Sequence, residues 1–192
     1  GLSVLFRSKR TTQRGIFLAR VLCVMSTPSS AHKGINFAEL HCLSNYSFLR
    51  GASHPEELVE RAHELGYQAI ALTDECTYSG LVKAHVAAEK LGIKLIVGAE
   101  FAFKTSPSGN SVTEKLVLLA PTRSAYGQLS AFISALRRRA NKGIYSAELK
   151  DFSFGLKECL ALWIPYQRSI DQQVVIGQQL KEALPQLWLA LE

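Results

Sequence analysis

Three side chains that can bind a divalent cation follow three apolar stretches of the sequence. His41 ends the stretch INFAELH, Asp74 ends QAIALTD and Glu100 ends KLIVGAE. The carboxyl ends of parallel strands meet at one edge of a sheet, so we expect these side chains to share a rim. One imidazole and two carboxylates can hold a divalent metal ion and leave coordination positions open for water or a phosphate. Residue type and spacing alone favour a simpler role, because acids at strand ends more often cap a helix or stay solvated.

The segments around these residues predict alternating strands and helices. The first helix has Ser53 as its N-cap, Glu56 three residues later and Gly66 at its end. Its buried stripe is predicted at Leu58, Ala62 and Leu65. Alternation with short connections is typical of an α/β fold with a mainly parallel sheet. Strands are expected over 35–41, 68–74, 93–101, 115–120, 159–165 and 186–192, and helices over 53–66, 78–92, 122–143 and 174–183.

The chain has the length and composition of one globular domain with a hydrophobic core, since 47% of its 192 residues are hydrophobic. The net charge of +6 comes from one end: residues 1–38 hold six Lys and Arg and no acid, and sixteen basic and sixteen acidic residues follow. We therefore interpret residues 1–35 as a basic tail that is disordered or upstream sequence, with a targeting segment as the alternative. The neutral body gives no charge argument for nucleic-acid binding.

Two further patterns bear on where the protein works. The apolar stretch GIFLARVLCVM is interrupted by Arg20 and is too short to cross a bilayer, so no membrane anchor is predicted. The four cysteines are widely spaced and form no C-x-x-C pair, which indicates a reducing compartment, the cytoplasm.

The stretch FAELHCLSNYSFLRGASHPEELVERAHELGYQAIALTDECTYSGLVKAHVAAEKLGIKLIVGAEF resembles a known family. It is similar to the N-terminal PHP (polymerase and histidinol phosphatase) domain of bacterial DNA polymerase III alpha subunits, and most similar to their error-prone, DnaE-type branch. The resemblance covers residues 36–192 and continues through KLVLLAPTRSAYGQLS and CLALWIP. It implies a partial, distorted (β/α) barrel of the PHP type, incomplete at its C-terminus, whose strand ends hold up to three metal ions in active members.

The resemblance also assigns positions to the site. The family's H-x-H pair corresponds to His41 and Leu43, and its Asp-His pair corresponds to Asp74 and Glu75. The glutamate of the third family block is present as Glu100. Leucine cannot bind a metal ion, whereas the carboxylate of Glu75 still offers oxygen ligands.

One more departure weakens the implied site. A histidine usual before the LLA strand is Lys115 here, which places an ammonium group where a cation would sit. We therefore expect a degraded site, too poor in ligands for the multi-metal cluster that phosphodiester hydrolysis needs. The predicted metal ligands are His41, Asp74 and Glu100, with Glu75 as a weaker fourth. The cofactor that the resemblance implies is a divalent Zn, Mn or Mg ion at what remains of this site.

The predicted function follows from the resemblance. The chain is interpreted as the N-terminal fragment of an error-prone DNA polymerase that acts in damage tolerance and translesion synthesis, with a structural role for this domain. The fragment is predicted to be inactive alone, because its only aspartates are Asp74, Asp151 and Asp171, without a D-x-D pair for two-metal nucleotidyl transfer. The expected partners are DNA, through the polymerase region of the parent chain, and other replication or repair proteins.

Two alternatives remain open. A free-standing metal-dependent PHP phosphoesterase would bind manganese or zinc tightly and turn over substrate, but Leu43 and Lys115 disfavour it. A non-catalytic interaction module would do neither.

Overall fold

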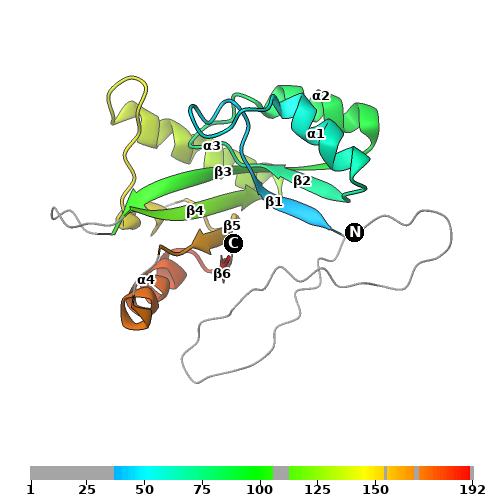
Figure 1. The fold of residues 1–192 in the computed structure, drawn as a ribbon. Coiled ribbons are helices and arrows are strands. Elements are labelled where there is room, and N and C mark those ends of the chain that lie inside the picture. The colour runs from blue at the N-terminus through cyan, green and yellow to red at the C-terminus, as the bar shows by residue number, and fades with distance from the viewer. Residues whose placement is uncertain (1–36, 106–112, 154, 167–168, 191–192) are drawn as a thin grey trace, which may run out of the picture.

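Strands and helices alternate along the chain in the computed structural model, which describes residues 37–105, 113–153, 155–166 and 169–190 (Figure 1). The basic tail predicted for residues 1–35 lies outside the described residues. None of the helices found in the described ranges is long and apolar enough to cross a membrane. The elements are β1 (Ala38–Cys42), α1 (Pro55–Glu64), β2 (Ala69–Leu72), α2 (Leu81–Leu91), β3 (Lys94–Lys104), β4 (Thr113–Ala120), α3 (Arg123–Arg138), the 3-10 helix η1 (Leu149–Ser153), β5 (Leu160–Ile164), α4 (Ile170–Ala183) and β6 (Leu187–Leu189).

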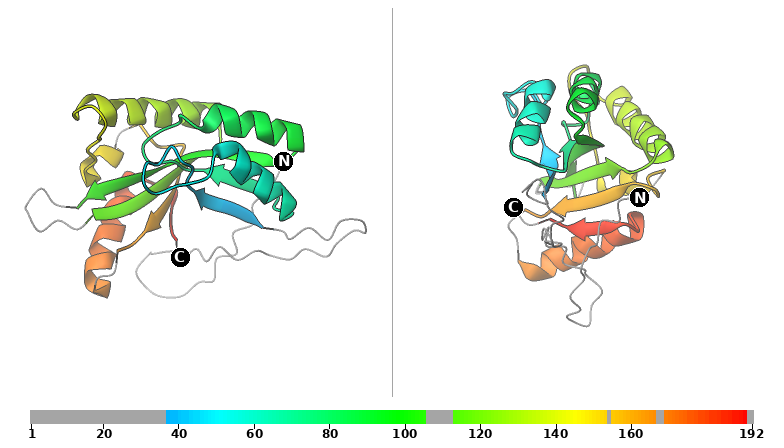
Figure 2. Two further views of the ribbon diagram at one scale, coloured as in Figure 1. Left: turned by 45° about the horizontal axis from the view of Figure 1, so that its top comes forward. Right: turned by 90° about the vertical axis from the view of Figure 1, so that its right-hand side faces the viewer.

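The six strands form one curled sheet in the order of the sequence, β1-β2-β3-β4-β5-β6, which has the shape of a half-barrel (Figure 2). The pairs β1-β2, β2-β3 and β5-β6 are parallel, whereas β4 is antiparallel to both of its neighbours. The mainly parallel sheet expected from the alternation is therefore interrupted at β4. Only residues 105–112 separate β3 from β4, too few for the helical crossover that a parallel pair requires.

The reversed direction of β4 brings a basic residue to the edge where β1 and β2 end. Lys115 lies near the start of β4 and pairs with Ala102 of β3, while Val117 pairs with Glu100. Side chains two residues apart on a strand share a face, so Lys115 and Glu100 lie on the same side of the sheet.

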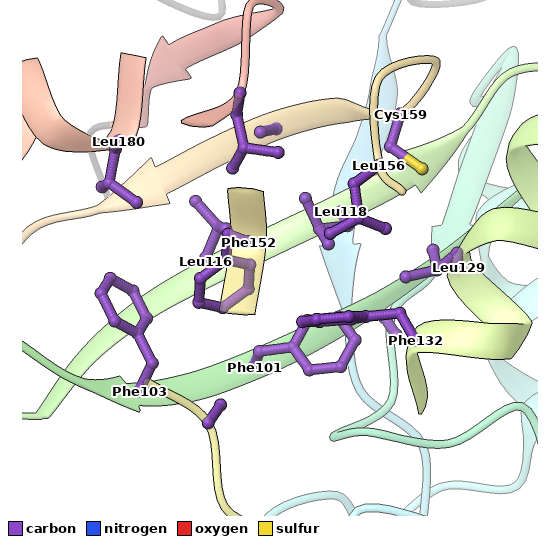
Figure 3. Close-up of a cluster of buried hydrophobic side chains, with 14 of the residues drawn as sticks. Phe101, Phe103, Leu116, Leu118, Leu129, Phe132, Phe152, Leu156, Cys159 and Leu180 are labelled. Carbon is purple, nitrogen blue, oxygen red and sulfur yellow. The ribbon is translucent and has the colours of Figure 1, made fainter. Parts of the chain in front are cut away.

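Helices cover the outer face of the sheet. The buried cluster of β2 includes side chains of α1 and α2, and the larger cluster of β3, β4 and β5 includes side chains of α3, η1 and α4. Figure 3 shows the centre of the larger cluster, where Phe152 of η1 meets Phe103 at 5.0 Å and Phe132 at 5.3 Å between ring centroids. The inner face holds a smaller apolar cluster around Ala71 and Val117. A strand therefore divides its side chains between two apolar layers, as a barrel wall does.

The first helix begins one residue later than the sequence pattern predicted. Its N-cap is His54 in place of Ser53, and the backbone N–H of His54 donates to the Glu57 carboxylate at 2.8 Å. Pro55 takes the first helical position, where its fixed φ and missing N–H cost nothing. The buried residues of the helix are Pro55, Val59 and Ala62, whereas the expected Leu58 is partly buried and the expected Leu65 is 41% exposed. The prediction that a glycine ends the helix is confirmed, since Gly66 has a φ of 74°.

Candidate functional site

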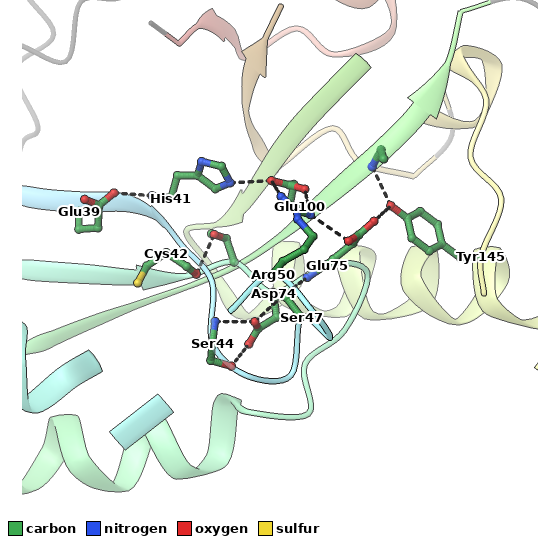
Figure 4. Close-up of polar contacts among 12 residues, drawn as sticks. Glu39, His41, Cys42, Ser44, Ser47, Arg50, Asp74, Glu75, Glu100 and Tyr145 are labelled. Carbon is green, nitrogen blue, oxygen red and sulfur yellow. Dashed lines mark hydrogen bonds and ion pairs between the residues drawn. The ribbon is translucent and has the colours of Figure 1, made fainter. Parts of the chain in front are cut away.

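The predicted site residues lie where β1, β2 and β3 run side by side. His41 lies near the end of β1, as predicted, whereas Asp74 and Glu75 lie just beyond β2, which ends at Leu72 and not at Asp74. Glu100 does not end its strand, because β3 continues to Lys104 along β4. A bridge between Glu75 and Glu100 extends the β2-β3 pairing, and the N–H of Cys76 donates to the Glu100 carbonyl at 2.9 Å. The structure thus places His41, Glu75 and Glu100 around one edge of the inner face (Figure 4).

The centre of this edge is the buried carboxylate of Glu100, whose side chain is 0% exposed. The Nε2 atom of His41 lies 2.7 Å from Glu100 Oε2. The guanidinium of Arg50 donates from Nη2 to Glu100 Oε2 at 3.1 Å and from Nη1 to Glu100 Oε1. Nη1 also donates to Glu75 Oε2 at 2.9 Å. One guanidinium therefore joins the two carboxylates that the sequence assigned to a metal ion.

These contacts decide the charge state of Glu100. Burial alone raises the pKa of its carboxyl group, because a low dielectric disfavours the charged form. Hydrogen bonds from His41 and Arg50 and the positive charges of Arg50 and Lys115 outweigh burial and hold the Glu100 pKa at about 2. The hydrogen bond to Glu100 is also the main reason that the pKa of Arg50 is raised. The pair is ionised at any physiological pH.

Asp74 has a different role in the structure. Its carboxylate is 1% exposed and turns into the loop that follows β1. Oδ1 accepts hydrogen bonds from the Ser44 N–H at 2.7 Å and the Ser47 hydroxyl at 2.6 Å, and Oδ2 accepts from the Ser44 hydroxyl at 2.6 Å. Asp74 therefore ties the loop of residues 43–51 to the end of β2.

The segment after β2 is also held from the other side. Tyr145 donates its hydroxyl to Glu75 Oε1 at 2.8 Å and accepts the Ala102 N–H at 2.7 Å. At the end of α3, Arg137 donates to the carbonyl oxygens of Glu75 and Cys76, each at 3.1 Å. The Glu75 carboxylate is thus oriented by Tyr145 as well as by Arg50.

The arrangement does not fit the multi-metal cluster that the PHP resemblance implies. Within the described ranges, no three His, Cys, Asp or Glu residues are placed so that they could hold a metal ion together. The Arg50 guanidinium stands between the carboxylates of Glu75 and Glu100, and the Asp74 oxygens are engaged by the loop. The assignment of metal ligands to these positions stays a prediction.

Sequence reasoning missed three residues that shape the site, namely Arg50, Ser44 and Ser47. One signal pointed to a cation, because the carboxylates of Glu75 and Glu100 need a counter-charge when the family's histidines are absent. No pattern in the sequence indicates which basic residue supplies this positive charge. The two serines look like ordinary loop residues, and only the backbone path brings both to one carboxylate.

Comparison with known proteins identifies the family of this chain. The pattern of the PHP domain family matches residues 39–172. An error-prone DNA polymerase from Saccharophagus degradans is 45% identical over 157 residues, which cover 82% of this chain and 15% of the polymerase. The error-prone DNA polymerase of Teredinibacter turnerae is 55% identical over 129 residues, or 67% of this chain and 12% of the polymerase. This chain therefore spans about one seventh of the curated relatives' length.

Solved structures support the fold. An amidohydrolase from Chromobacterium violaceum, solved with bound sulfate and without metal, has a TM-score of 0.60 at 18% identity and covers 76% of this chain and 74% of its own. A protein from Bifidobacterium adolescentis assigned as a metal-dependent phosphoesterase has a TM-score of 0.53 at 15% identity, with 74% of each chain covered. With these barrels as structural neighbours and error-prone DNA polymerases as sequence relatives, the chain belongs to the PHP domain family.

Proposed function

We propose that this chain is the PHP part of an error-prone DNA polymerase and supports the polymerase as a structural module that does not hydrolyse phosphate esters. In the parent protein it serves DNA-directed DNA synthesis, a nucleotidyl transfer, during damage tolerance and translesion synthesis in the cytoplasm. Its partners there are DNA, bound by the polymerase region, and other replication or repair proteins. The identity of 45–55% to error-prone polymerases supports this context.

The placement of Asp74 carries the structural part of the proposal. Asp74 corresponds to the metal-binding acid of the family's second block, yet its carboxylate accepts three hydrogen bonds from Ser44 and Ser47. Both serines are buried, and their three hydrogen bonds occupy most of the lone-pair positions of the carboxylate, so a metal ion there would compete with donors that water cannot easily replace. A carboxylate used in this way stabilises a loop and is not available for hydrolytic chemistry.

The remaining aspartates do not form a polymerase centre. Asp151 pairs with Arg139, and Asp171 lies in the first turn of α4. Two-metal nucleotidyl transfer needs carboxylates that share both ions. Polymerisation is therefore proposed for the parent protein as a whole and not for these residues.

The proposal is tested by measuring metal content and phosphodiesterase turnover on the purified chain. Mass spectrometry is expected to find far less than one metal ion per chain, and turnover should stay at background with and without added manganese. Circular dichroism on the same sample establishes that the protein is folded. Near-stoichiometric metal together with turnover that His41→Ala abolishes would overturn the proposal and support the free-standing phosphoesterase.

A further inference from the structure

We propose that the Arg50 guanidinium is the resident cation of this edge of the sheet and takes the place of a divalent metal ion between Glu75 and Glu100. His41, Glu75 and Glu100 are not placed to hold a metal ion together in this structure, and the removal of this one positive charge would let them close up around a divalent cation. The inference deepens the proposed function and rests on it, because an edge that carries its own cation can support a fold without binding metal.

The contacts of Arg50 are those of a bridging cation. Its two terminal nitrogens reach both oxygens of Glu100, and Nη1 also reaches Glu75 Oε2 at 2.9 Å. A metal ion between two carboxylates would make contacts to the same oxygens. A guanidinium can imitate this because its planar fork matches carboxylate geometry.

The carboxylates need such a cation. Glu100 is fully buried, and a buried carboxylate without a partner is strongly unfavourable. Glu75 faces it across the β2-β3 bridge, so two negative charges are held close together by the backbone. His41 contributes a third group, with Nε2 at 2.7 Å from Glu100 Oε2. An imidazole and two carboxylates are the ligand types of a catalytic or structural divalent site.

The backbone of the loop of residues 43–51 positions the guanidinium of Arg50. The N–H groups of Arg50 and Gly51 donate to the Ser47 carbonyl at 2.9 and 3.0 Å, which folds the chain into a tight turn. Leu49 stands in the left-handed region with a φ of 60°, a conformation that costs energy for any residue with a side chain. Asp74 anchors the same turn through the Ser47 hydroxyl. The backbone therefore holds Arg50 at the two carboxylates rather than letting it reach them by chance.

The test compares Arg50→Met with Arg137→Met in the whole 192-residue chain. Methionine keeps much of the length of the arginine side chain and removes its charge. Arg137 is a matched control, since it binds the same segment through the carbonyl oxygens of Glu75 and Cys76 and touches neither carboxylate. Each variant is unfolded thermally with Mn²⁺ and with EDTA.

The expected result is specific to Arg50. R50M should lose about 10 °C in Tm in EDTA, as expected when one partner of a buried ion pair is removed, and should regain at least half of this in Mn²⁺. The Tm of the wild type should be the same in Mn²⁺ as in EDTA, and so should the Tm of R137M. A second substitution, Glu100→Gln in the R50M background, should abolish the response to Mn²⁺.

Two results would overturn the inference: an R50M protein with no response to Mn²⁺, or an R137M protein that responds equally. If R50M does not fold in EDTA, refolding from urea in Mn²⁺ is expected to restore it, and a failure to do so counts against the inference. Phosphodiesterase turnover by the wild-type chain contradicts the proposed function instead, so the two failures are distinguishable.

Discussion

Replacement of Asp74 by alanine should strongly destabilise the fold, because three buried donors would lose their acceptor. The Ser44 N–H, the Ser44 hydroxyl and the Ser47 hydroxyl all donate to this carboxylate within 2.7 Å. A buried donor without an acceptor costs about 1–3 kcal/mol. The three costs are not additive, since the loop can move and admit water, so we expect Asp74→Ala to lower the free energy of unfolding by about 3–4 kcal/mol. This is a large part of the stability of an ordinary domain.

Asp74→Asn provides the matched control. Its amide oxygen can take the place of Oδ1 and accept from the Ser44 N–H and the Ser47 hydroxyl. Its NH₂ group would stand at Oδ2 and donate to the Ser44 hydroxyl, which can accept as well as donate. The negative charge and the acceptor for the Ser44 hydroxyl hydrogen are lost, so the free energy of unfolding should fall by about 1–2 kcal/mol.

Urea unfolding followed by tryptophan fluorescence measures both variants. Trp163 is buried in β5 and should report loss of the sheet. The m value is expected to stay constant, because the same surface is exposed on unfolding. The reasoning is refuted if Asp74→Ala stays within about 1 kcal/mol of wild type, less than the loss of a single buried charged hydrogen bond. It is also refuted if Asp74→Asn is less stable than Asp74→Ala.

Two further predictions concern the loop and use the same urea assay. Leu49→Gly should raise the free energy of unfolding by about 0.5 kcal/mol, because relief of the left-handed φ outweighs the extra flexibility of glycine. Phe48→Gly, at an equally exposed neighbour without a positive φ, should lower it, and equal effects would contradict the argument. Gly51→Ala should lower it by more than about 2 kcal/mol, since its Cβ would stand 2.0 Å from the Ser44 carbonyl oxygen. Gly127→Ala, in open space on α3, should instead raise it by about 0.5–1 kcal/mol, and a loss there would count against this comparison.

The alternation of strands and helices was predictable from the sequence, whereas the direction of one strand was not. Apolar runs such as 115–120 mark a buried strand but carry no information on which way it runs. The short connection after β3 makes β4 antiparallel, and the resulting hairpin extends β3 to Lys104. Glu100, which the apolar run placed at a strand end, therefore lies inside a strand and faces Val117 of β4.

The grouping of the site residues was partly predictable. The rule that parallel strands end at one edge of a sheet correctly placed His41 and Glu100 near each other. The Nε2 atom of His41 lies 2.7 Å from Glu100 Oε2. It could not predict that Asp74 turns away, because side-chain direction just beyond a strand depends on the loop that covers it. It could not predict Arg50 either, since an arginine in a polar loop is usually solvated and only the turn around Ser47 carries it inward.

The charges at this edge bear on the proposal that the chain keeps the fold without hydrolysing phosphate esters. Glu75 and Glu100 carry two negative charges, which one divalent ion would balance. Here Arg50 bridges them, and the charge of Lys115 acts on Glu100 from the same face. Two fixed monovalent cations therefore supply the charge of one metal ion. A metal ion also lowers the pKa of a bound water and polarises a phosphoryl oxygen. A guanidinium stays protonated, has no open coordination position and cannot generate hydroxide. In the proposed structural module, this exchange would preserve the electrostatic stabilisation of the edge and remove the reactive group.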